Sequence, residues 1–213
     1  MTEPQTATVG LSHPIAPEDK ARADFYALLS RLYAAAPDDA LLRAIAGAGP
    51  LPIAVDHGPA LDLATSWGVL GAASAAMDPG AASEEYQELF IGVGKSEVSL
   101  HASAYLPSTG RSELATVRAT LADLGLGRKS GVNVYEDHLA AVCETMRVLI
   151  SGGAGLEPFG LAEQRRFFDA HVGSWVFACC TAIKACPIAN YYRRVGQFTE
   201  FFMAIERDSF AIE

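Results

Sequence analysis

"ASEEYQELFIGVGKS", residues 82–96, decides between two folds for this chain. The Gly-Lys-Ser at 94–96 matches the end of a phosphate-binding loop, G-x-x-x-x-G-K-[ST], which follows a buried strand. The first glycine of that pattern is missing, because Leu89 stands five residues before the second. The preceding residues have a helical period instead, with Tyr86, Leu89 and Phe90 on one face. The stretch therefore predicts a helix followed by a loop, and argues against a nucleotide hydrolase.

The same helical period recurs along most of the chain. Apolar stripes separated by Gly- and Pro-rich breaks predict a helix from Pro17 onward and further helices at about 38–46, 60–77, 81–91, 114–124, 139–150, 161–170, 175–185 and 191–205. No alternating pattern of useful length indicates a strand. We therefore predict an all-α fold, a single globular bundle of about eight to nine helices over 18–213, preceded by a flexible N-terminal tail at 1–17.

The composition restricts the classes of function. The 213 residues are 50% hydrophobic and 19% charged, which suits one domain with a sizeable core. With 16 basic and 25 acidic residues, the net charge is −9. Nucleic acid is not expected as a partner, because neutralising phosphates requires a basic face. A basic peptide is compatible with this charge.

The cysteines and the N-terminus indicate the compartment. No C-x-x-C pair occurs, so small apolar core residues are expected rather than a metal site or disulfides at Cys143, Cys179, Cys180 and Cys186. Free thiols suit a reducing cytoplasm. The first 20 residues lack the basic and apolar regions of a signal peptide, and no apolar run is long enough to span a membrane. We predict a cytoplasmic protein.

The segment "NVYEDHLAAVCETM", residues 133–146, carries the residues most suited to chemistry. We expect Asn133 to cap a helix whose first turn holds Glu136 and Asp137. An acid beside a histidine can orient the ring or raise its pKa, as Asp137 could do for His138. No nucleophile motif, metal-ligand spacing or cofactor loop accompanies the pair. The residues alone indicate an all-α domain that is not an enzyme and has no metal or cofactor.

Four segments, in order, resemble the TorD/DmsD/NarJ-type family of redox-enzyme maturation chaperones. "EYQELFIGVGKSEVSLHASAYL" (85–106) is similar to the family's E-Y-x-x-L-F-x-G block and the loop after it. "YEDHLAAVCETM" (135–146) resembles the E-P-E-D-H-hydrophobic motif, with Tyr135 in place of the usual proline. "FFDAHVGSWVFACCTAI" (167–183) and "YYRRVGQFTEFFMAIE" (191–206) resemble the family's F-x-x-x-H-hydrophobic-x-x-W helix pair and its closing helix.

This resemblance implies a TorD-like, all-helical chaperone without catalytic activity. Such proteins bind the twin-arginine signal peptide, or the immature catalytic subunit, of a molybdenum-containing oxidoreductase of the dimethyl sulfoxide reductase type. They assist cofactor insertion before export. The residues that the family links to peptide binding correspond to Tyr86, Leu89, Phe90, Asp137 and His138. Glu136 is expected to add a second acid for the arginines of the peptide.

Other interpretations of the same residues stay open at this point. The stripe of Tyr86, Leu89 and Phe90 is also typical of a helical core, as is Trp175, and His171 is typical of a core or helix-end histidine. A helical scaffold that docks a folded partner is one alternative, and an enzyme with Asp137 and His138 as a general base is another. The loop at 92–99 reads as a flexible connector beside a peptide groove. Because some family members have been suggested to bind GTP, a weak nucleotide site also stays open.

Overall fold

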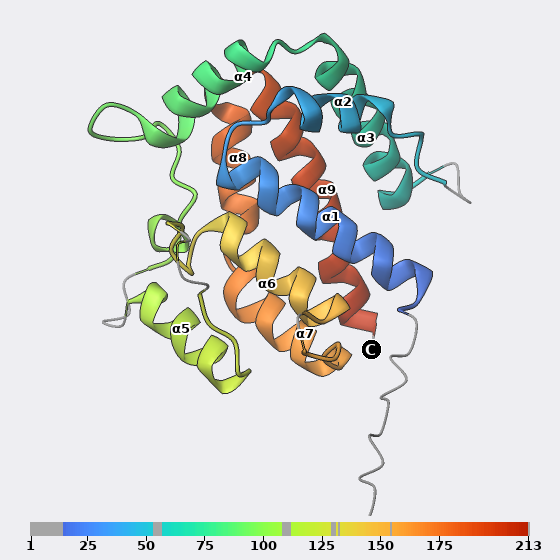
Figure 1. Cartoon of the computed structure of the whole chain (residues 1–213), viewed down its shortest axis with the longest axis vertical. Coiled ribbons are helices and arrows are strands. Elements are labelled where there is room, and N and C mark those ends of the chain that lie inside the picture. Colours follow the sequence, from blue (N-terminus) through green and yellow to red (C-terminus); the bar gives the residue numbers. More distant parts are fainter. Residues whose placement is uncertain are drawn as a thin grey trace, which may run out of the picture.

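The computed structural model describes residues 15–52, 57–107, 112–128, 131, 133–153 and 155–212. It is all-helical, as predicted (Figure 1): its helices are α1 (Pro17–Ala34), α2 (Asp39–Gly47), α3 (Pro59–Ala76), α4 (Pro79–Tyr86), α5 (Glu113–Asp123), α6 (Leu139–Ser151), α7 (Leu161–Phe168), α8 (Val176–Ala185) and α9 (Tyr191–Ile212). The described residues contain no strand, only the isolated bridges His101–His138 and Gly153–Leu156. The predicted tail lies almost entirely outside the described residues.

Short-range chemistry explains where several helices begin. Asp38 accepts a hydrogen bond from Leu41 N at 2.7 Å, and Asp78 accepts one from Ala81 N at 3.0 Å. Each aspartate thereby pairs one of the amides that the first turn of a helix leaves without a partner. Proline stands in the first turn of α1, α3 and α4, where its missing N–H costs no hydrogen bond. These signals explain why the predicted boundaries lie close to the observed ones.

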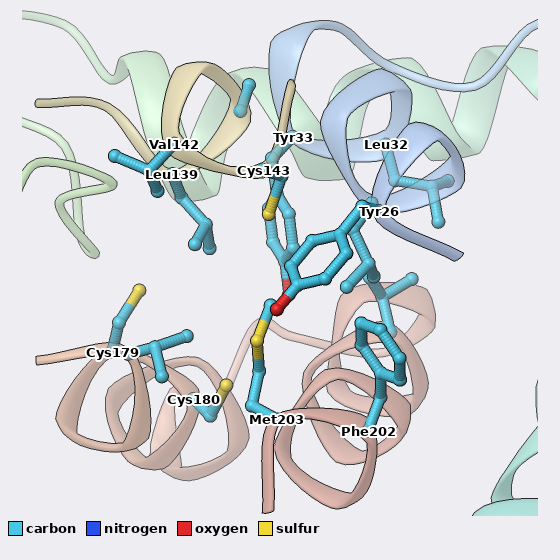
Figure 2. Close-up of a cluster of buried hydrophobic side chains, with 14 of the residues drawn as sticks. Tyr26, Leu32, Tyr33, Leu139, Val142, Cys143, Cys179, Cys180, Phe202 and Met203 are labelled. Atoms are coloured by element: carbon cyan, nitrogen blue, oxygen red, sulfur yellow. The ribbon is translucent and has the colours of Figure 1, made fainter. Parts of the chain in front are cut away.

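The core is formed where α1 packs on α6 and where α9 packs on α3 and α8. Figure 2 shows side chains of α1, α6, α8 and α9 converging, among them Tyr26, Cys143, Cys180 and Met203. The predicted placement of the cysteines is confirmed for Cys143, Cys179 and Cys180, which are buried free thiols, whereas Cys186 is only half-buried.

Helix α4 does not end in a regular α-turn. Its last turn widens into the π-helix η1 (Gln87–Ile91), and the chain leaves it at Gly92 with φ of 65°. A Cβ at this glycine would lie 2.1 Å from Lys95 O, so no other residue fits the turn without a shift of backbone. Val98 N then donates to Leu89 O at 2.9 Å, which closes the loop back onto η1.

One expectation about helix α6 is wrong. The helix begins at Leu139, so Asn133 does not cap it, and Glu136 and Asp137 lie before its first turn. Glu136 and Asp137 lie in a turn, and His138 is held in an extended conformation, because Leu139 N donates to Leu100 O at 2.8 Å and Ala102 N donates to Asp137 O at 3.0 Å. Pairing with the 100–102 segment therefore delays the start of the helix.

Candidate functional site

The E-Y-x-x-L-F block joins three helices, beginning with Glu85. The Glu85 carboxylate accepts hydrogen bonds from the backbone amides of Asn190, Tyr191 and Tyr192 at 2.8, 2.9 and 2.8 Å. A buried acid of α4 thereby caps the N-terminus of α9 from outside that helix. Sequence reasoning missed this role, because a cap normally comes from the residues just before the helix.

The apolar residues of the block are buried in this structure. Tyr86, Leu89 and Phe90 are 6%, 0% and 8% exposed. Tyr86 Oη donates to Tyr33 O at 3.1 Å, and the Tyr86 and Phe90 rings both pack edge-on or tilted against Tyr192. Tyr86 and Phe90 thus face α1 and α9, Leu89 is buried in the core, and none of the three side chains forms an open wall.

Asp137 pairs with a histidine, but not with its sequence neighbour. Its carboxylate oxygen Oδ1 lies 3.0 Å from His101 Nδ1, and its side chain is almost fully buried. The His101 side chain is 36% exposed. The backbone pairing of the 100–102 and 137–139 segments brings these residues together, which no pattern of spacing in the sequence predicted.

His138 is the N-cap residue of α6, because its Nδ1 accepts a hydrogen bond from Ala140 N at 3.1 Å. Burial and, to a smaller extent, the nearby His101 lower the pKa of His138 to about 4, against the opposing effect of Asp137. Asp137 does act to raise this pKa, as expected, but burial outweighs the acid and the net shift is downward. At neutral pH the ring is therefore uncharged, and because Nδ1 is an acceptor, its proton is on Nε2.

Glu136 is held by two arginines that sequence reasoning did not identify. Arg118 Nη2 lies 3.0 Å from Oε2, and Arg128 Nε lies 3.9 Å from Oε1. Burial acts to raise the pKa of Glu136, but Arg118 and Arg128 outweigh it and the pKa is lowered. Among the described residues, no donor makes a hydrogen bond of good geometry with the buried Oε2, so its contact with Arg118 is an ion pair. The Glu136 carboxylate is thus charged and incompletely hydrogen-bonded.

A groove of about 360 Å³ opens beside Glu136, between α1, α5 and α6. Its lining is mostly small or apolar: Ser30 and Ala34 of α1, Leu121 of α5, Leu126, Gly127, Arg128, Val134 and Glu136 of the α5–α6 connection, and Ala140, Ala141, Glu144, Thr145 and Val148 of α6. Glu136 and Glu144 are its acids, and Glu144 is paired with Arg147 at 2.7 Å. The groove therefore combines a mostly small or apolar lining with two acids and one arginine, Arg128.

Trp175 and His171, the other residues that the sequence singled out, are buried in the core. Trp175 is buried and donates from Nε1 to His171 O at 2.7 Å, and His171 Nε2 lies 2.8 Å from Thr120 Oγ1, so both lie in the core as expected. Within the described part of the chain, no three His, Cys, Asp or Glu side chains are grouped to hold a metal ion. None of its helices is long and apolar enough to cross a bilayer.

Comparison with known proteins gives one family. The model of the nitrate reductase delta subunit matches residues 57–181, more than half of the chain. The matched region runs from α3 into α8 and contains Glu85, the loop after η1 and the Glu136–His138 segment. No curated protein matches the chain significantly.

Proposed function

The chain belongs to the nitrate reductase delta subunit family, whose members are chaperones for the maturation of molybdenum enzymes, and from this membership we propose that it binds a segment of such an enzyme before it is complete. The segment is the twin-arginine signal peptide, or part of the immature catalytic subunit, of an oxidoreductase of the dimethyl sulfoxide reductase type. Binding takes place in the cytoplasm and holds back export until the molybdenum cofactor is inserted. The proposal assigns no catalytic step to this chain.

The groove beside Glu136 is the observation that carries the proposal. A twin-arginine signal has two arginines followed by an apolar run, so its receptor needs apolar surface with acids at one end. Ala140, Ala141 and Val148 supply apolar surface, and Glu136 and Glu144 supply the acids. At Glu136, the arginines of the peptide take the place of Arg118 and Arg128.

This exchange is physically feasible at Glu136. Its partners Arg118 and Arg128 are 47% and 38% exposed, so either can turn into water when a peptide arginine arrives. The Glu136 side chain is only 11% exposed, so losing both arginines without replacement would leave a buried charge unpaired, whereas exchanging them for a peptide guanidinium keeps the charge paired. A peptide guanidinium that also donates to Oε2 supplies the hydrogen bond that this oxygen lacks.

Asp137 and His138 have a different role in the proposal. Asp137 holds the His101 ring, and His138 presents an Nε2–H that can donate to a main-chain carbonyl of the peptide. Tyr86, Leu89 and Phe90 contact a peptide only in a state in which α4 has moved away from α1 and α9, since all three are buried in this structure. We therefore propose that the groove beside Glu136 is the first contact site.

Filling the groove tests this function. Ala141 lines it, and a phenylalanine there occupies the space for peptide side chains. Calorimetric titration uses a synthetic peptide with two arginines followed by about 12 apolar residues. Ala141→Phe is expected to weaken binding about tenfold or more, equivalent to ~1.4 kcal/mol. The matched control Ala119→Phe, on the exposed face of α5 outside the groove, is expected to bind like wild type.

The role of the acid is tested separately. Glu136→Gln keeps the size of the side chain and removes its charge, so binding is expected to weaken by ~1.5–3 kcal/mol for the peptide with two arginines. A peptide with two glutamines is expected to show no difference between wild type and Glu136→Gln. Unchanged binding by both Ala141→Phe and Glu136→Gln refutes the groove as the peptide site. Replacing Asp137 or His138 is less informative, because each also holds the backbone around the start of α6.

A further inference from the structure

A second groove, of about 410 Å³, lies on the outer side of the contact between α3 and α9. The two helices run antiparallel, since Ser74 Oγ lies 3.0 Å from Tyr191 Oη while the Trp67 and Phe198 rings are 5.3 Å apart. The lining comes from one face of each helix: Asp62, Thr65, Ser66 and Val69 of α3, and Arg193, Arg194, Gln197 and Phe201 of α9. The peptide groove contains none of these residues.

Two adjacent arginines give this groove a positive end. Arg193 Nη2 donates to Cys186 O at 3.1 Å, and Arg194 donates to the carbonyl and the side chain of Asn190. Neither guanidinium forms an ion pair with a carboxylate of the described residues. Each has five N–H donors, so most remain available to a ligand.

The one acid of the lining lies away from the arginines. In the antiparallel register set by Ser74 and Tyr191, Val69 lies near the arginines. Asp62 lies seven residues before Val69, toward the N-terminus of α3, which places it about 10 Å from Val69 along the helix at ~1.5 Å per residue. The partners of Arg193 and Arg194 precede them in the sequence, so both side chains extend toward the N-terminus of α9 and away from Asp62.

Apolar surface lies beside this positive end. Val69 is 50% exposed, which is high for a large apolar residue on a helix that packs well. Phe201, seven residues after Arg194, is partly buried further along the same groove. Thr65 is exposed on the wall. An anionic group on the arginines would thus have an apolar neighbour within reach.

We propose that the α3–α9 groove docks an acidic segment of a partner protein. Carboxylates of the segment receive hydrogen bonds from Arg193 and Arg194, an adjacent apolar side chain packs on Val69, and a further apolar side chain of the segment reaches Phe201. The charge of this site is opposite to that of the peptide groove, whose acids suit a basic ligand. Because α3 and α5 lie on opposite sides of the molecule in Figure 1, both grooves can be occupied at the same time. This inference does not depend on the proposed function.

Fluorescence anisotropy with a labelled synthetic peptide of alternating glutamate and leucine tests the docking site. The wild-type chain is expected to bind it, and more weakly as salt is raised, because salt screens charges. The double change Arg193→Gln and Arg194→Gln is expected to weaken binding about tenfold or more, since hydrogen bonds to charged groups contribute ~1.5–3 kcal/mol. The double change Arg165→Gln and Arg166→Gln is the matched control, because these adjacent exposed arginines of α7 carry the same charge outside both grooves, and it is expected to bind like wild type.

Each remaining outcome overturns the proposal. Failure of the wild-type chain to bind the acidic peptide overturns it, as does equal binding by the double variant. Complete competition by inorganic phosphate at equal concentration identifies a small-anion site instead. Self-association of the wild type that the double variant loses, measured by sedimentation, identifies a second copy of the chain as the occupant. Circular dichroism of the double variant checks that its helicity is unchanged.

Discussion

Replacing Glu85 by glutamine is predicted to destabilise the fold by about 2–4 kcal/mol. Glutamine has the same size, but its amide nitrogen cannot accept a hydrogen bond, so one of the three amides of Asn190, Tyr191 and Tyr192 loses its partner. An unpaired buried N–H costs ~1–3 kcal/mol. The other two bonds lose the assistance of the charge, and the N-terminus of α9 loses a negative partner that contributes ~0.3–2 kcal/mol.

Urea unfolding followed by circular dichroism measures this loss. The midpoint is expected to fall with an unchanged slope, and the melting temperature to fall by about 5–15 °C for a chain of this length. Glu84→Gln is the matched control, because Glu84 is exposed on the same helix and its replacement is expected to stay within ~0.5 kcal/mol of wild type. If Glu85→Gln is as stable as Glu84→Gln, and exchange of the amides at 190–192 is not accelerated, the capping argument is refuted.

Three further predictions concern the loop and the start of α6. Gly92→Ala is expected to lower the free energy of unfolding in urea by about 2–4 kcal/mol, because φ is positive and the added Cβ meets Lys95 O. Gly94→Ala, where φ is also positive but the Cβ enters open space, should lower it by only ~1 kcal/mol, and equal losses would contradict the argument. Lys95→Ala is expected to leave peptide binding unchanged, and tight magnesium-dependent nucleotide binding that disappears in this variant would contradict the connector interpretation. Folding lowers the pKa of His138, so the stability that the neutral ring contributes is complete above pH 6.5 and is lost as the pH falls toward 4. Relative to His138→Asn, wild type should therefore lose about 1–2 kcal/mol of unfolding free energy between pH 6.5 and 5. Parallel pH profiles of the two proteins would contradict the lowered pKa.

The positions of the helices could be predicted from the sequence because the signals that set them are local. The stripe of Tyr86, Leu89 and Phe90 has a helical period, and η1 ends within the predicted segment 81–91. The same period does not reveal what covers a stripe. The burial of these three residues is a property of packing, and an apolar stripe has the same pattern whether it faces a core or an open groove.

The sequence by itself determined the helical class, most helix boundaries and the placement of the buried cysteines, because period, capping residues and apolar content act within a few residues along the chain. Only the tertiary structure decided the partners of the charged groups. Asp137 stands beside His138 in the sequence but pairs with His101, and Glu85 caps a helix that begins more than 100 residues later. Hydrogen bonds and ion pairs depend on distances in space, which backbone pairing and helix packing set and residue spacing does not.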